Sequence, residues 1–360
     1  MERSMKAWRL ERMGGAFRLE DVPVPAVRPG SVLVRVEASL LMSYIKPYVE
    51  GRLPFYSTPD EPFTPVGNGV GVVEAVGRDV WGVKPGQRVL ISSLFVANER
   101  VTDPSRVLIG VTAMDSAGKA MQIDWPNGTL ADYALYPAGA VTPVEGLSDI
   151  DSPQLAAVVR CLIPYGGLLR GRLVGGETVI VTGASGAYGS AAVLLAVAMG
   201  AGKVVAAGRN AGALSRLASA GGTRVEAVVL SGDVQADAAA LRAAAGGGAQ
   251  MAFDMVGQAT DPNATLAALG ALRRGGRLVL MGSMTVPLPL SYTHLMANDL
   301  EIIGQFMYPA DASRRLLDLV SAGLLKIGAI VPKTFALADL PQAMEATATA
   351  TNLECVVVRP

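Results

Sequence analysis

The sequence feature that most constrains the fold is a glycine-rich turn between two apolar runs. VIVT at 179–182 leads into GASGAYG at 183–189, and SAAVLLAVAMG follows at 190–200. Such a turn between a strand and a helix lets the backbone approach a pyrophosphate, and the helix N-terminus adds N–H donors. Because a second strand follows at 204–208, the order predicts a dinucleotide-binding unit. The expected cofactor contacts in this turn are Gly183, Ser185, Gly186, Ala187, Tyr188 and Gly189.

The end of the second strand indicates which cofactor this unit binds. An NAD site has an Asp or Glu there for the ribose 2′-hydroxyl. This chain has Gly208, Arg209 and Asn210, and a guanidinium suits the 2′-phosphate of NADPH. We therefore expect NADPH, with these residues and Gly282, at the end of a later strand, as contacts. The alternative for Arg209 is a solvated surface arginine.

Alternating elements continue this unit through the second half of the chain. From about residue 149, alanine-rich helical stretches alternate with short apolar runs, which predicts an α/β fold with a doubly wound parallel sheet. The predicted strands lie at 179–183, 204–208, 227–230, 251–257, 277–282 and 300–306. The first half is β-rich, with strand candidates at 31–38, 69–76 and 88–92.

The end of the chain is expected to return to the N-terminal half. A helix at 310–322, a strand near Val331 and a strand at 356–358 follow the parallel sheet. If these elements pair with the N-terminal half, residues 1–148 and 308–360 form one discontinuous domain, and residues 149–307 form a nucleotide-binding domain inserted between its two parts. The polar segment 93–127 is long for a loop and is expected to be functional or the remnant of a lobe, although such a segment can contain short elements.

Rare residue types limit the metal and nucleophile sites available. The chain has 1 His, His294, and 2 Cys, Cys161 and Cys355. A structural zinc site needs four Cys or His ligands, and a catalytic one needs about three protein ligands. A Ser-His-Asp triad would have to use His294. Two cysteines exclude a disulfide framework, which fits a reducing cytosol and predicts a cytoplasmic protein.

The charge balance and the apolar runs exclude other partners. The 31 Lys and Arg equal the 31 Asp and Glu, so the chain has no electrostatic footprint for nucleic acid or an anionic membrane. The uncharged stretch 178–202 is long enough to span a bilayer, but its glycines divide it into runs that are too short. The chain also starts without the apolar run of a signal peptide. We expect no nucleic-acid partner and no membrane segment.

Motifs along nearly the whole chain resemble the medium-chain dehydrogenase/reductase superfamily. VPVPAVRPGSVLVRVEAS at 22–39 and GVGVVEAVGRDVWGVKPGQRVLI at 69–91 are similar to the GroES-like domain of that family. GTLADYALYP at 128–137 resembles its closing strand. GASGAYGSAAVLLAVAMGA at 183–201 is similar to the fingerprint of the quinone oxidoreductase branch. The resemblance implies a GroES-like β-rich catalytic domain joined to a Rossmann domain.

The same resemblance identifies where the zinc ligands of the family would lie. Met42 stands where metal-binding members have a Cys, and Asn68 replaces the His of their Gly-His-Glu signature. Only Cys161 falls at a third ligand position, and a buried, inert thiol is the simpler interpretation. Segment 93–127 has no cysteine, whereas the structural-zinc lobe has four. The resemblance therefore implies an enzyme without zinc.

NADPH without a metal implies hydride transfer to a substrate that hydrogen bonds alone can activate. An enone, an enal or a quinone fits, because donors hold the developing enolate oxygen. Tyr44, at the position of the proton-relaying Ser or Thr of zinc members, is the first candidate donor, followed by Ser43 and Tyr48. Tyr56 is similar in placement to the donor region of enoyl reductases, and Asn68 has an amide donor. Each tyrosine is alternatively a wall or packing residue, and Asn68 a turn residue.

Two other functions stay open beside this small-molecule oxidoreductase. One is a metal-free ketone or aldehyde reductase, of the alcohol dehydrogenase type, with Tyr44 or Tyr56 as the acid. The other is a non-catalytic NADPH-binding sensor. Tyr165 matches a position that backs the nicotinamide in relatives. The apolar strand 300–307 would be a sheet edge, which relatives pair across a two-fold axis, so the resemblance implies a homodimer.

Overall fold

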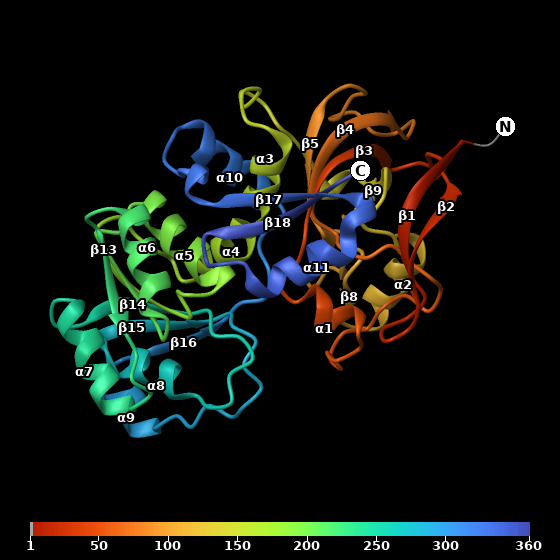
Figure 1. The fold of residues 1–360 in the computed structure, drawn as a ribbon. Coiled ribbons are helices and arrows are strands. Elements are labelled where there is room, and N and C mark those ends of the chain that lie inside the picture. The colour runs from red at the N-terminus through yellow and green to blue at the C-terminus, as the bar shows by residue number, and fades with distance from the viewer. Residues whose placement is uncertain (1–2) are drawn as a thin grey trace.

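Two large sheets form the framework of the molecule (Figure 1). The structure is a computed structural model and describes residues 3–360. One sheet has six strands in the order β13-β12-β11-β14-β15-β16, and every pair in it is parallel. Its strands are β11 (Thr178–Thr182), β12 (Lys203–Gly208), β13 (Val225–Val229), β14 (Ala249–Asp254), β15 (Leu272–Leu280) and β16 (Glu301–Gly304).

Helices connect the parallel strands, as a doubly wound sheet requires. They are α5 (Ala187–Ala198), α6 (Ala211–Gly221), α7 (Val234–Ala244), α8 (Asn263–Gly270) and α9 (Tyr292–Ala297). The strand order reverses between β11 and β14, so the crevice expected at a topological switch point opens at the carboxyl ends of these two strands.

The second sheet combines both ends of the chain. Its order is β10-β5-β4-β3-β18-β17, and β9 also pairs with β3. The C-terminal strand β18 pairs antiparallel with β3, so the blue end of the chain lies beside the orange strands in Figure 1. The strands are β3 (Ser31–Leu40), β4 (Gly69–Val76), β5 (Arg88–Ile91), β9 (Tyr133–Pro137), β10 (Val141–Pro143), β17 (Val331–Ala336) and β18 (Glu354–Arg359).

Smaller elements surround this second sheet. β1 (Ser4–Leu10) and β2 (Phe17–Pro23) form a hairpin. Segment 93–127 folds into the three-stranded sheet β6 (Leu94–Val96), β7 (Arg106–Leu108) and β8 (Thr112–Ala113), followed by α2 (Ser116–Asp124). The remaining α-helices are α1 (Ile45–Val49), α3 (Ser152–Val158), α4 (Leu162–Arg170), α10 (Ala312–Ser321) and α11 (Leu340–Thr349). The short 3-10 helices are η1 (Ala138–Ala140), η2 (Val159–Cys161), η3 (Ile327–Ala329) and η4 (Leu337–Asp339).

The predicted α/β fold, with a GroES-like β-rich part and a parallel sheet, is confirmed. The domain bounds, 1–148 with 308–360 and 149–307, stay a prediction. Segment 93–127 contains short elements, including a sheet of its own whose residues Val107 and Ala113 are buried. The segment is therefore an ordered part of the fold.

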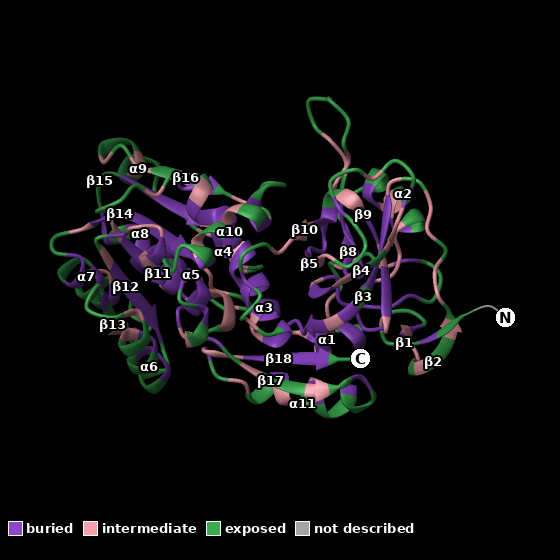
Figure 2. Ribbon diagram, turned by 90° about the horizontal axis from the view of Figure 1, so that it is seen from above, coloured by how far each residue is buried: buried purple, intermediate pink, exposed green. Residues whose placement is uncertain are grey.

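Helix α5 explains the long uncharged stretch of the sequence. It packs on β11 and β12 and also contacts α4, α6 and η2, so apolar residues surround it. From Gly189 to Ala196 every side chain of α5 is buried (Figure 2). A helix enclosed in this way has no face for charged residues. Among the described residues, no helix combines the length and apolarity needed to cross a bilayer.

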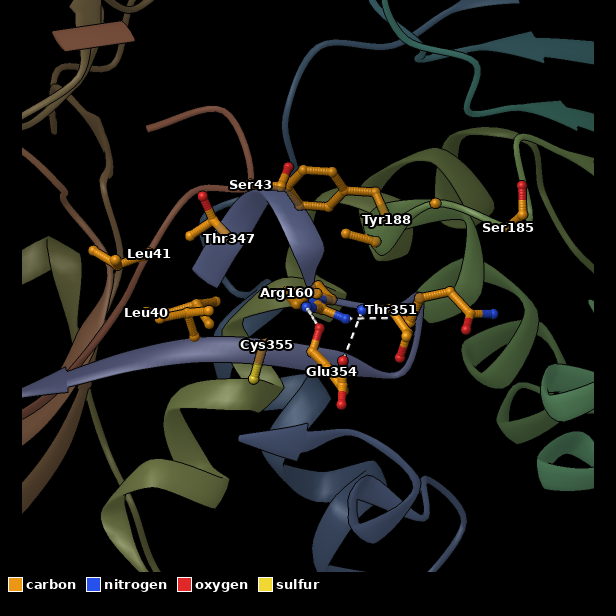
Figure 3. A pocket seen from close by; sticks show the side chains of 15 residues that line it. Leu40, Leu41, Ser43, Arg160, Ser185, Tyr188, Thr347, Thr351, Glu354 and Cys355 are labelled. Carbon is orange, nitrogen blue, oxygen red and sulfur yellow. Dashed lines mark hydrogen bonds between the residues drawn. The ribbon is translucent and has the colours of Figure 1, made fainter. Parts of the chain in front are cut away.

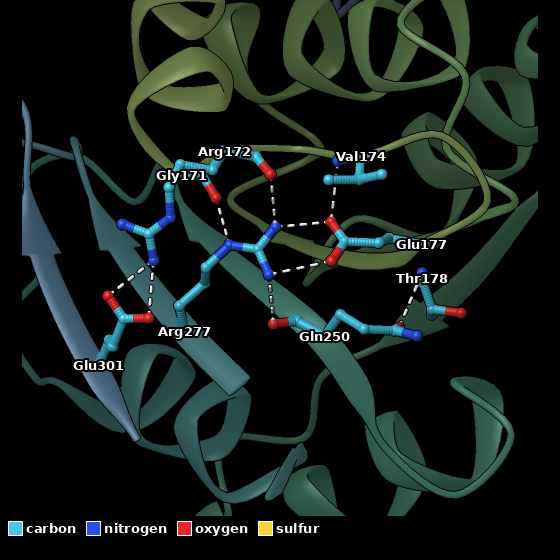
Figure 4. A network of polar contacts seen from close by, with 8 residues as sticks. All are labelled: Gly171, Arg172, Val174, Glu177, Thr178, Gln250, Arg277 and Glu301. Atoms are coloured by element: carbon cyan, nitrogen blue, oxygen red, sulfur yellow. Dashed lines mark hydrogen bonds and ion pairs between the residues drawn. The ribbon is translucent and has the colours of Figure 1, made fainter. Parts of the chain in front are cut away.

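A buried arginine ties the parallel sheet to the loop before it (Figure 4). Arg277, on β15, donates to the carbonyl oxygens of Gly171, Arg172 (3.0 Å) and Gln250 (3.2 Å). It also forms an ion pair with Glu177 at 2.5 Å, in which the two side chains are 9% and 17% exposed. Burial alone would raise the pKa of Glu177, but the hydrogen bond and charge of Arg277 lower it below 4.5.

We predict that Glu177→Gln lowers the free energy of unfolding at pH 7 by about 3 kcal/mol, because it leaves a buried guanidinium without its counter-charge. The folded pKa lies below the unfolded one, so the carboxylate stabilises the fold above pH 4.5. This contribution is lost as the pH falls through the folded pKa. Urea unfolding of both proteins at pH 7 and at lower pH measures the difference.

The matched control is Glu301→Gln. Glu301 pairs with Arg172 at 2.6 Å, but both side chains are more than half exposed. An exposed pair of this kind contributes at most about 1 kcal/mol. Equal losses of stability in the two variants would contradict a special role for the buried pair.

Candidate active site

Three adjoining cavities lie where the glycine turn faces the second sheet. The glycine-turn cavity, about 420 Å³, lies along residues 186–189 and the loops after β14 and β15. The tyrosine cavity, about 240 Å³, lies between the loop after β3 and segment 93–127. The junction cavity, about 140 Å³, lies between the turn and β18. Tyr188 lines all three, so they belong to one site.

Close backbone contacts determine the shape of the turn. Gly183 has φ +66°, and a Cβ there would lie 2.7 Å from the carbonyl oxygen of Met255. A Cβ on Gly189 would lie 2.1 Å from the carbonyl oxygen of Gly183. Gly186 is the N-cap of α5 and no side chain caps this helix, so its first N–H groups face the cavities without a side-chain acceptor. This is the arrangement that binds a phosphate.

The other predicted cofactor residues surround this turn. Ser185 lines the junction cavity and packs against Gly208, and Gly282 lines the glycine-turn cavity. The Asn210 side chain accepts from the Ala213 N–H (3.0 Å) and caps α6. Arg209 is exposed beyond β12 and has no carboxylate partner among residues 3–360. Its guanidinium is therefore available to a ligand.

Besides Tyr188, two tyrosines line both the tyrosine cavity and the glycine-turn cavity. Tyr44 is the N-cap residue of α1, and its ring lies 5.9 Å from that of Tyr56 between centroids. Burial raises the pKa of both phenols. Both phenols are therefore neutral at pH 7, and each keeps a proton that it can donate to a ligand.

The remaining predicted donors have different environments. Ser43 is exposed and lines the junction and glycine-turn cavities. The Oδ1 atom of Asn68 accepts from the Ser93 N–H at 2.8 Å, which leaves its Nδ2 amide beside the tyrosine cavity. Tyr48 is fully buried and donates to the Val111 carbonyl oxygen at 2.6 Å, so its hydroxyl has a structural partner.

Tyr165 lies away from the cavities, and so do Tyr48, Gly183, Gly208, Arg209 and Asn210, which line none of the three. Tyr165 is 4% exposed and packs under the Arg315 guanidinium at 5.5 Å. Ile163, two residues earlier, lines the tyrosine and glycine-turn cavities instead. The distinction depends on which helix face turns inward, and periodicity over this apolar segment does not reveal it.

Two side chains in the site have roles that the sequence does not reveal. The sequence places Tyr188 in the turn, but its ring also faces the tyrosine cavity. Burial raises the pKa of the Tyr188 phenol to about 12, although the charge of Arg160 acts to lower it. Arg160 is 7% exposed and lines the junction cavity. The only sequence signal for Arg160 is one charge within the apolar run 155–169.

The residues at the expected metal positions do not fit zinc. Met42 and Asn68 line the tyrosine cavity and offer a thioether and an amide. Cys161 is fully buried, lines none of the three cavities, and burial raises its pKa to about 12. Within residues 3–360 no three His, Cys, Asp or Glu residues gather where they could hold a metal ion. His294 lies exposed on α9.

Comparisons with known proteins agree with this architecture. A family model described as alcohol dehydrogenase GroES-like domain matches residues 28–146, and one described as zinc-binding dehydrogenase matches 187–322. An alcohol dehydrogenase of Moraxella sp. (strain TAE123) is 30% identical over 331 residues, covering 89% of this chain and 90% of that protein.

Two further relatives extend the comparison. An acryloyl-coenzyme A reductase of Metallosphaera sedula is 28% identical over 351 residues, covering 95% of this chain and 96% of that protein. The crystal structure of AibC superposes with a TM-score of 0.82 at 24% identity, covering 100% of this chain and 97% of that one. The chain is therefore an oxidoreductase of the medium-chain dehydrogenase/reductase superfamily, a family that binds NAD(P).

Proposed function

We propose that this chain is a zinc-independent, NADPH-dependent reductase of α,β-unsaturated carbonyl compounds or quinones. The observation that carries the proposal is the tyrosine cavity, in which neutral donors stand among apolar walls. Its polar groups include the phenols of Tyr44 and Tyr56 and the Asn68 amide, and none of its lining residues is charged. The apolar walls include Met42, Phe55, Leu108, Val111, Met114 and Phe306.

Residues for the cofactor lie at and near the adjoining glycine-turn cavity. The N–H groups that begin α5 would hold the diphosphate, and Arg209, exposed beyond β12, would bind the 2′-phosphate. The absence of a carboxylate at 208–210 favours NADPH over NADH. When bound, NADPH supplies the hydride. Tyr188 lines both this cavity and the tyrosine cavity, at their boundary.

The chain's own part in the reaction is to hold the substrate oxygen. Tyr56 and Tyr44, whose rings pack 5.9 Å apart, donate their protons toward that oxygen, and Asn68 Nδ2 is a further donor. These donors stabilise the negative charge that develops on an enolate oxygen. The buried walls Met42, Leu108 and Val111 lower the polarity around these donors, which strengthens the same hydrogen bonds. No step requires a metal ligand, which is why we propose zinc independence.

A ketone or aldehyde reductase is the second candidate. It is favoured by the Tyr44–Tyr56 pair, because a neutral phenol can protonate an alkoxide. The names of the relatives include both chemistries, alcohol dehydrogenase and acryloyl-coenzyme A reductase. We place the enone or quinone first because the cavity offers only hydrogen bonds for polarising a simple ketone. A non-catalytic NADPH-binding sensor is the third.

The partners proposed are a small-molecule substrate and a second copy of the chain. β16 is an edge strand of the parallel sheet, and α9, which leads into it, exposes Tyr292 at 79% and Met296 at 61%. An edge strand beside exposed apolar side chains favours pairing. We also propose a cytoplasmic location, because both cysteines are free and buried.

The proposed function is tested by turnover of NADPH and NADH with enones, quinones and saturated ketones. We expect enone or quinone reduction with NADPH at a kcat/KM at least tenfold above that with NADH, unchanged by EDTA. Reduction confined to saturated ketones would favour the second candidate. Tight NADPH binding without turnover would favour the sensor, and stoichiometric zinc with loss of activity in EDTA would contradict zinc independence.

Tyr56→Phe is expected to lower kcat about 100-fold, because it removes one of the neutral phenol donors from the tyrosine cavity. The Kd for NADPH, measured by fluorescence titration, should stay unchanged. Since burial raises the pKa of both phenols above 10.0, kcat/KM should not fall between pH 7 and pH 9.5.

Tyr48→Phe is the control for this substitution. Its hydroxyl bonds to Val111 outside the reaction, so the variant should lose about 1 kcal/mol of stability and keep its kcat. Equal losses of kcat in both variants, or a basic inflection near pH 8, would contradict the assignment of Tyr56.

For the homodimer, sedimentation velocity should give about twice the chain mass of 37.2 kDa. Tyr292→Glu should shift the protein toward the monomer by placing a charge beside the β16 edge. Trp81→Glu, at a position 84% exposed on the other sheet's side, should not. A wild-type protein that sediments as a monomer would refute the dimer.

A further inference from the structure

The junction cavity contains polar groups that the proposed reaction does not use. It lies between the glycine turn, whose residues Ser185 and Tyr188 line it, and the chain segment that follows α11 (Figure 3). Figure 3 shows Arg160 on one side of this space and Tyr188 and Ser43 on another. Its lining therefore combines the N-terminus of α5 with side chains from the second sheet.

Arg160 carries a charge that no protein group neutralises. It belongs to η2, is 7% exposed, and forms no ion pair with any carboxylate of residues 3–360. Its Nη1 donates to the carbonyl oxygen of Asn352 at 3.0 Å, and its Nη2 donates to that of Glu354. A guanidinium has five N–H groups, so three remain. A buried charge is costly without a counter-charge, which indicates that an anion belongs beside it.

Asn352 needs a hydrogen-bond donor from the ligand, whereas Arg160 needs an acceptor. It is 3% exposed, and its Nδ2 donates to the Ala213 carbonyl oxygen at 3.0 Å. Its own carbonyl oxygen accepts from Arg160 and from Ser190 Oγ at 2.6 Å. Its Oδ1 atom is buried and has no partner among the described residues. An orphaned buried acceptor requires a donor, such as a hydroxyl group.

The lining of the junction cavity therefore suits a ligand that carries both an anionic group and a hydroxyl group. The anion would face Arg160 and the first N–H groups of α5, and the hydroxyl would face Asn352 Oδ1. A ribosyl diphosphate has this combination of groups. The Asn352 amide also touches α6, which begins after Arg209, so it lies toward the side of the site expected to hold the adenosine ribose.

We propose that Arg160 and Asn352 clamp the ribosyl-diphosphate of the dinucleotide from outside the glycine motif, with Arg160 as its principal cation. This inference rests on the proposed NADPH function. Arg160 comes from the segment before α4 and Asn352 from the segment before β18, so the clamp joins the nucleotide unit to the C-terminal strand. Ribose and diphosphate occur in both NADPH and NADH, so the clamp serves both cofactors equally, unlike Arg209.

The test is a set of Kd values for NADPH and NADH, from fluorescence titration of the whole protein. Arg160→Gln removes the charge and keeps an amide that can donate to one of the carbonyls. It should weaken both cofactors at least tenfold and by the same factor. Asn352→Leu removes the orphaned acceptor and should weaken both several-fold. Inorganic pyrophosphate should compete with NADH in the wild type, and this competition should be lost in Arg160→Gln.

Two variants separate this inference from its alternatives. Arg209→Ala should weaken NADPH alone, so equal losses for both cofactors there would refute the NADPH assignment and leave the Arg160 result intact. Arg88→Met removes another arginine that bonds to a carbonyl, that of Ile150 at 2.6 Å, outside the three cavities. It should leave both Kd values unchanged.

The remaining outcomes overturn one proposal or the other. A folded Arg160→Gln protein with wild-type Kd values would refute the clamp. A wild-type protein that binds neither cofactor would refute the proposed function, and the clamp with it. If Arg160→Gln does not fold, Arg160→Lys keeps the charge without the planar fork and should weaken both cofactors alike. Unchanged pyrophosphate competition and Kd values in that variant would refute the guanidinium's role.

Discussion

The close approach of Gly189 to the Gly183 carbonyl is the constraint on which the site depends. A Cβ at position 189 would lie only 2.1 Å from that oxygen, so only glycine permits the chain to turn from β11 into α5. The turn fixes where α5 begins, and α5 lies buried against both the parallel sheet and η2. Tyr188, in the turn, and Arg160, in η2, therefore reach their cavities from one rigid unit.

The site separates charge from neutral hydrogen bonding. In the proposed function the cofactor is bound by Arg160 and Arg209, cations without carboxylate partners among the described residues. The proposed substrate meets Tyr44, Tyr56 and Asn68, which offer neutral donors in an apolar cavity. Burial supports this division, because it raises the pKa of the phenols and so keeps their protons in place. A permanently anionic cofactor and an oxygen that gains charge only during reaction require these different partners.

Strands, helices and turns that depend on neighbouring residues could be predicted from the sequence. Side-chain positions that depend on tertiary packing could not. The strand–turn–helix pattern predicted β11, α5 and the parallel sheet, because glycine spacing and apolar periodicity are local. The sequence also singled out Tyr44, Tyr56 and Asn68, which do line one cavity. It could not separate Tyr48 from them, because only the fold places Val111 against the Tyr48 hydroxyl. The position of Tyr165 likewise depended on which face of α4 turned inward.

Arg160 shows why long-range partners cannot be predicted from sequence alone. Its two hydrogen-bond acceptors lie 192 and 194 residues away, on the segment that leads into β18. That segment reaches the nucleotide unit only because β18 pairs with β3 and returns the chain to the second sheet. A single arginine within an apolar run suggests a surface charge, yet the return of the C-terminus buries it. The return of the C-terminal segment to the second sheet thus creates the buried environment for which we propose an anion beside this arginine.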